Sequence, residues 1–248
     1  MLSDLTNPSS ERINQLYRLV LRRPATARET DAGLNFIQSA ATAPPPKPPE
    51  PVVTAWQYGF GAFDAASGRV TNFTALPHFT GDAWQGGPAW PDAKLGWVQL
   101  TAEGGHAGDD VAHAAIRRWV APRAGAVSIS GGVRHEETAG DGIRARLVSS
   151  RSGLLGEWIL HNQKAEAKAD AVPVQPGDTL DFLVDIHGTL NSDNFKWSPA
   201  IKMVVGTDDE WSAKREFRGP TQPPPPPLSA WEQYAQVLLL SNEFLFVD

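Results

Sequence analysis

The clearest strand signal in the chain lies at residues 176–186, which read PGDTLDFLVDI. The proline, glycine and aspartate at its start are turn residues. From residue 180 onward every second position is apolar up to residue 186, and Asp181 and Asp185 fall on the opposite face. A period of two is the period of a strand with one buried face. The stretch therefore predicts a strand of an antiparallel β-sheet.

Similar short runs surround this strand, and glycine, proline, aspartate and asparagine separate them. They lie at residues 56–63, 97–101, 114–120, 127–130, 143–147, 158–161 and 201–205. Together these runs indicate about nine strands. Many short strands joined by turns favour an antiparallel sandwich. We expect a mainly β fold, a jelly-roll-like antiparallel β-sandwich.

Two proline-rich runs bracket this β region. Residues 43–51 read APPPKPPEP, and residues 219–227 read GPTQPPPPP. Proline fixes φ and has no backbone N–H, so both runs predict extended linkers outside any packed core. The expected organisation is a split host domain (1–43 and 228–248), two linkers (44–51 and 219–227) and an inserted sandwich (52–218).

The two ends of the chain have helical patterns. Capping-box spacing occurs at Thr26 and Glu29, and again at Ser229 and Glu232. Apolar residues follow at the spacing of one helix face; they are Ile13, Leu16, Tyr17 and Val20 in the first helix and Trp231, Tyr234, Ala235 and Leu238 in the last. Helices this short are marginal alone. We expect them to pack together in a small α-helical domain; two unrelated frayed ends are the alternative.

Composition excludes several classes of function. The net charge of −6 argues against a nucleic-acid partner, and no apolar run approaches the length of a membrane span, about 18 residues. Cysteine is absent, which excludes disulfides, thiolate metal sites and covalent attachment of c-type haem. The N-terminus has no signal-peptide pattern. Either the protein is cytoplasmic, or this chain is the end of a longer exported protein.

A family resemblance favours the second interpretation. The run LYRLVLRRP at residues 16–24 and the tail AQVLLLSNEFLFVD at residues 235–248 resemble the C-terminal domain of planctomycete-type proteins that combine a cytochrome c domain with domains of unknown function. The central block resembles the carbohydrate-binding-like sandwiches inserted in some members, with Gly177-Asp178, residues 191–193, Trp197 and Pro199 as the similar positions. The resemblance implies a periplasmic or extracellular parent protein, with any haem in a part of it that this chain lacks.

The loop at residues 79–92 is the first candidate site. Its glycines and prolines mark it as a surface loop, and such loops often carry function. Trp84 and Trp90 offer flat faces to a sugar ring, and Asp82 and Gln85 offer hydrogen bonds to its hydroxyls. The alternative is that both indoles close one end of the core, because tryptophan is usually largely buried.

The segment at residues 185–194 is the second candidate site. Asp185, Asn191, Asp193 and Asn194 carry the oxygen ligands that calcium prefers. The spacing is not that of an EF-hand. A turn whose side chains satisfy their own backbone is the alternative.

Catalysis has weaker support. Glu136 and Glu137, which follow His135, are neighbours in sequence, as are Asp109 and Asp110, so on a strand the two carboxylates of each pair point to opposite faces. Glycoside hydrolysis instead needs an opposed pair. We expect a non-catalytic module that binds a polysaccharide or glycan and contacts other domains of its parent protein. A structural or protein-interaction sandwich and a glycoside-acting enzyme are the alternatives.

Overall fold

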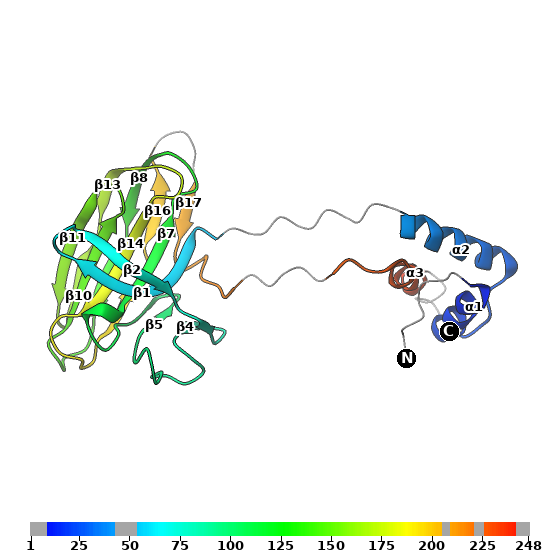
Figure 1. Ribbon diagram of the computed structural model, residues 1–248, viewed down its shortest axis with the longest axis horizontal. Coiled ribbons are helices and arrows are strands. Elements are labelled where there is room, and N and C mark those ends of the chain that lie inside the picture. The colour runs from blue at the N-terminus through cyan, green and yellow to red at the C-terminus, as the bar shows by residue number, and fades with distance from the viewer. Residues whose placement is uncertain (1–8, 43–53, 205–208, 221–225, 242–248) are drawn as a thin grey trace. The chain divides into compact units, whose positions relative to one another are not determined.

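The computed structural model describes residues 9–42, 54–204, 209–220 and 226–241 (Figure 1). The chain divides into two compact units, Met1–Pro51 with Gln222–Asp248, and Val52–Thr221. The first predicted linker, residues 44–51, lies outside the described residues, as do residues 221–225 of the second linker. Residues 242–248, part of the tail that carries the family resemblance, also lie outside them.

The described residues of the first unit contain three helices: α1 (Ser10–Val20), α2 (Ala27–Thr42) and α3 (Ala230–Leu239). The predicted caps are present. The Thr26 backbone N–H donates to Glu29 Oε2 (2.7 Å) at the start of α2, and Ser229 and Glu232 form a complete capping box at the start of α3. None of the described helices has the length and apolar character that a membrane span requires.

The apolar faces of the three helices meet in one small core. Its buried members are Ile13, Tyr17, Leu21, Ile37, Tyr234 and Leu238. Gly33 of α2 lies against the Tyr234 ring, where an added Cβ would be 2.5 Å from the hydroxyl oxygen. The expectation that the helices from the two chain ends pack on one another is confirmed.

In the part of the second unit that the structure describes, the strands form three antiparallel sheets. In a six-stranded sheet the order is β11 (Gly153–Leu160), β10 (Ile143–Ser149), β14 (Thr179–Ile186), β7 (Ala114–Val120), β1 (Trp56–Asp64), β2 (Arg69–Ala75). In a seven-stranded sheet it is β12 (Gln163–Glu166), β9 (Gly132–His135), β15 (Asn194–Trp197), β6 (Gly104–His106), β5 (Gln99–Thr101), β4 (Ala83–Gln85), β3 (His78–Phe79). In a four-stranded sheet it is β13 (Ala169–Val174), β8 (Gly125–Ser130), β16 (Ala200–Met203), β17 (Glu210–Ser212). A short 3-10 helix, Val111–His113, precedes β7.

One buried cluster joins the inner faces of all three sheets. Phe182 of β14 contacts Trp197 of β15, with ring centroids 5.2 Å apart. Trp119 of β7 contacts Trp211 of β17 at 5.1 Å. The six-stranded sheet is therefore one layer of a sandwich, and the other two sheets form the opposite layer. Of the residues that the structure describes, 42% are in strands and 19% in helices, so the predicted mainly β class with helices at both ends is confirmed.

The strand count differs from the prediction. Within the described residues there are seventeen strands and not about nine. Several of the additional strands have only two to four residues, and alternation cannot be recognised over so short a run. The predicted loop at residues 79–92 is one such place, because it contains β4 and the end of β3.

Candidate functional site

Trp84 faces the interior of the sandwich. It lies on β4 opposite Leu100 of β5, a core residue. Its half-buried indole stacks on Tyr58 with centroids 6.0 Å apart, and its Nε1 donates to the Arg218 carbonyl oxygen (2.9 Å). Packing against a core aromatic and a satisfied N–H are the features of a structural side chain.

Asp82 bonds within its own loop, and Gln85 bonds both to that loop and to β5. The buried Gln85 amide donates to the Gly87 carbonyl oxygen (2.7 Å) and accepts from Gln99 Nε2 (2.8 Å). Asp82 is exposed and accepts from the Thr80 hydroxyl (2.6 Å). The buried Gln85 side chain thus helps to fix the conformation of the loop that follows β4.

Trp90 lies in the loop that follows β4 and packs against Trp97, away from Trp84. It is 37% exposed, and its Nε1 donates to the Trp97 carbonyl oxygen (3.0 Å). The two indoles stand almost at right angles (85°) with centroids 4.9 Å apart, and the His106 ring lies within 6 Å of both (5.8 and 5.5 Å). The structure therefore does not bring Trp84 and Trp90 together.

The four predicted metal ligands are also divided. Asp185 is buried on β14, and its carboxylate pairs with Arg144 (3.0 Å) and Arg146 (2.5 Å). Burial raises the pKa of Asp185, against the lowering effect of the two guanidinium groups. Asp185 is thus engaged in a largely buried ion-pair network with Arg144 and Arg146, and it does not join Asn191. No cluster of three or more His, Asp or Glu side chains suited to a metal ion occurs among the described residues.

Asp193 closes its own turn. Its Oδ2 accepts from the Asn191 backbone N–H (2.7 Å), while its Oδ1 is buried and has no hydrogen-bond partner in the described part of the chain. Burial raises the pKa of Asp193. This arrangement holds the exposed Asn191 and Asn194 on either side of the turn.

Trp90 and these two asparagines line one hollow of about 530 Å³, which we name the Trp90 hollow. Its lining residues are Trp90, Trp97, His106, Leu190, Asn191, Ser192 and Asn194. One residue from the first predicted site and two from the second thus meet here. The lining combines indole faces with amide and hydroxyl groups.

His106 is the buried polar group of this hollow. Its Nδ1 lies 2.6 Å from the Ala107 carbonyl oxygen, which can only accept, so Nδ1 carries the proton. Burial lowers the pKa of His106, which keeps the ring neutral. In that state Nε2 is an acceptor for a hydroxyl group.

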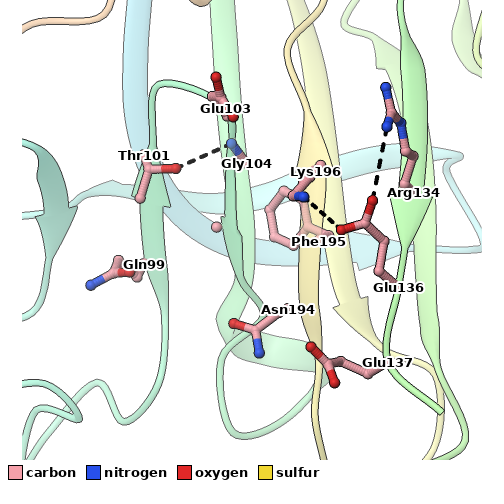
Figure 2. Close-up of a pocket in the computed structure, with 11 residues that line it drawn as sticks. Gln99, Thr101, Glu103, Gly104, Arg134, Glu136, Glu137, Asn194, Phe195 and Lys196 are labelled. Atoms are coloured by element: carbon pink, nitrogen blue, oxygen red, sulfur yellow. Dashed lines mark hydrogen bonds and ion pairs between the residues drawn. The ribbon is translucent and has the colours of Figure 1, made fainter. Parts of the chain in front are cut away.

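A second hollow, of about 410 Å³, continues from the first across Asn194; we name it the Glu136 groove. Figure 2 shows Gln99 and Thr101 of β5 on one side and Lys196 and Glu136 on the other. The remaining lining residues are Glu103, Gly104, Gly105, Arg134, Glu137, Asn194 and Phe195. Lys196 Nζ pairs with Glu136 at 2.6 Å, so the charges of this wall largely neutralise one another.

Arg117 fastens the floor of the groove from the interior. It is fully buried on β7, in the opposite layer, and has no carboxylate partner among the described residues. Its guanidinium donates to the carbonyl oxygens of Thr101 (2.5 Å), Gly104 (3.4 Å) and Trp197 (2.8 Å). Burial lowers the pKa of Arg117 to about 10, so it remains charged at neutral pH.

Sequence reasoning missed Trp97, Gln99, His106 and Arg117. Residues 97–101 were predicted as a strand, and its alternation places Trp97, Gln99 and Thr101 on one face. That alternation could have indicated the side of the Glu136 groove that Gln99 and Thr101 form. No local pattern indicates Arg117, because its partners lie on distant strands.

The chain matches no protein-family model and no curated protein. Among solved structures it is similar to a family 35 carbohydrate binding module from Clostridium thermocellum, over 38% of this chain and 72% of that chain. The identity is 13% and the TM-score 0.23. A similarity of this size carries no argument, so the function is inferred from the site alone.

Proposed function

We propose that the sandwich is a non-catalytic module that binds carbohydrate in the Trp90 hollow. The observation that carries this proposal is the exposed indole of Trp90, at a right angle to Trp97 and beside the amides of Asn191 and Asn194. A sugar ring has an apolar C–H face and a polar edge. The indole face suits the former, and amide oxygen and N–H groups suit the latter.

The arrangement also supports binding over chemistry. The lining supplies a hydrogen-bond acceptor at His106 Nε2, donors and acceptors at the asparagines, and flat apolar surface at the tryptophans. These groups orient a ligand. Membership of a planctomycete-type exported parent protein, by contrast, stays a prediction.

Affinity electrophoresis of the full chain in gels that contain soluble xylan, glucan or mannan tests the proposal. Aromatic anchors at binding hot spots contribute about 2 kcal/mol or more, so Trp90→Ala should weaken retardation by about thirtyfold. Ile159→Ala is the control, because Ile159 is 51% exposed on β11 in the other layer. Equal retardation of Trp90→Ala and the unchanged protein would refute a Trp90 site.

A further inference from the structure

The Trp90 hollow and the Glu136 groove lie on one face of the seven-stranded sheet. Gln99 pairs with His106, and His106 pairs with Asn194, so these three residues form a row across β5, β6 and β15. Directly paired residues in antiparallel strands point to the same face. Asn194 lines both hollows and joins them.

The floor of the groove is bare backbone. A Cβ on Gly104 would strike the Phe195 carbonyl oxygen, and a Cβ on Gly105 would strike the Gln99 carbonyl oxygen. Both positions therefore require glycine, since the neighbouring strands approach too closely for any side chain. Gly104 places no side chain on this face, and the next residue of β6 on the same face is His106 of the Trp90 hollow, so the sheet is hollowed at Gly104. Figure 2 shows Gly104 between Thr101 and Lys196.

The floor is also held in place before any ligand arrives. A buried, unpaired guanidinium is an expensive group to bury, and Arg117 directs its donors to carbonyl oxygens on both sides of the groove. Such bonds restrict the sliding of β5 relative to β15. A rigid floor lowers the entropic cost of binding an extended ligand.

We infer that the Glu136 groove is a second subsite, and that the ligand is an internal stretch of a linear, uncharged polysaccharide. This inference rests on the proposed function. Glu103, Gly104 and Gly105 line the groove and not the Trp90 hollow. At about 3.3 Å per residue they extend over about 10 Å, room for about two sugar rings beyond the one in the Trp90 hollow. The ligand class is uncharged because the charges along the groove balance. Two cations, Arg134 and Lys196, stand with two carboxylates, Glu136 and Glu137, and Lys196 pairs directly with Glu136. The third carboxylate, Glu103, pairs with Lys214 (2.5 Å).

Titration calorimetry of the full chain tests the inference with xylo-, cello- and manno-oligosaccharides of two to six sugars. For the series that binds, the affinity should rise at least about tenfold from two sugars to four, and then level off. The double variant Lys196→Ala/Glu136→Ala removes one wall without changing the net charge. It should lower the affinity for four sugars about tenfold and that for two sugars by much less, because a two-sugar ligand reaches only the first part of the groove.

The double variant Lys168→Ala/Glu166→Ala is the matched control, because it removes another exposed ion pair (3.4 Å) that lines neither hollow. Equal affinities for two and four sugars would overturn the groove and leave the Trp90 site standing. The same holds if the Lys196/Glu136 variant binds four sugars as tightly as its control does. If none of the three series binds, both the site and its extension are refuted.

Discussion

Trp84 and Trp90 are six residues apart and end on different faces of the sandwich. Trp84 belongs to β4, whose pairing with β5 directs it to the core side, next to Tyr58. Trp90 follows β4 in a loop that folds over the outer side and rests on Trp97. The two side chains should therefore respond differently to truncation.

Trp84→Ala should destabilise the sandwich by about 2–3 kcal/mol, because it leaves a void beside Tyr58 and an unpaired Arg218 carbonyl oxygen. Trp90→Ala should change the free energy of unfolding by less than about 1 kcal/mol. Urea denaturation followed by circular dichroism measures both. A larger loss for Trp90→Ala than for Trp84→Ala would reverse the assignment of structural and binding residue.

Arg117→Met should destabilise the sandwich by about 2–4 kcal/mol. Three carbonyl oxygens lose their hydrogen-bond donor, at about 1–3 kcal/mol each. Part of that loss is offset because the variant no longer has to bury a charged group. Arg117→Lys keeps a hydrogen-bond donor but loses the planar guanidinium, so its stability should lie between that of the unchanged protein and that of Arg117→Met. Guanidinium chloride denaturation measures the free energy of unfolding of all three proteins and so gives their order of stability. A Met variant as stable as the unchanged protein would show that these bonds do not hold the strands.

At the scale of elements, caps and ion pairs define where the helices begin. Glu29 closes the capping box of α2 and also pairs with Arg23 (2.7 Å). The hydrogen bond from Arg23, the backbone bond at Thr26 and the nearby charge lower the pKa of Glu29 from 4.5 to about 2. The ionised form is thus favoured in the folded helical unit.

Acid should therefore loosen the start of α2. A carboxylate with a lowered pKa in the folded state stabilises that state above the unfolded pKa, and the contribution disappears as the pH falls from about 4.5 to about 2. Because the pair is partly exposed, the expected contribution is only about 1 kcal/mol. Amide exchange of the first turn of α2 between pH 5 and pH 2 measures it.

Glu29→Gln should remove most of this local pH dependence. Asp31→Asn is the control, because Asp31 is an exposed carboxylate of the same helix. If Asp31→Asn abolishes the dependence and Glu29→Gln does not, the capping box is not its source.

On the scale of the whole molecule, two cores are separate. The helical core draws on α1, α2 and α3, and the large core draws on the three sheets. No residue belongs to both clusters within the described parts of the chain. Each unit thus has its own source of stability.

A fragment of residues 52–221 should therefore fold alone. We expect a β-type circular dichroism spectrum and one cooperative urea transition, because the sandwich keeps its entire buried cluster. The complementary truncation, which ends the chain after residue 221, should melt α1 and α2, since it removes Tyr234 and Leu238 from their core. An aggregated 52–221 fragment, or undiminished exchange protection in α1 after truncation, would contradict the separation.

Local sequence patterns determined the class of the fold. Alternation at residues 180–186 placed Leu180, Phe182 and Val184 in the core, and the capping boxes placed the starts of α2 and α3. These features depend on neighbours within a few residues, so the sequence contains them directly. Domain boundaries predicted from the proline runs rest on the same kind of local chemistry.

Only the tertiary structure decided the candidate site. Trp90, His106 and Asn194 come from three segments that strand pairing brings to one face, and no pattern within a single segment indicates that meeting. Strand pairing also directs Trp84 toward the core and places Asp185 next to Arg144 and Arg146. The reason is that the face that a side chain occupies depends on the register of its strand. Register is a property of the sheet as a whole, and very short strands such as β4 and β6 do not reveal it in their own residues.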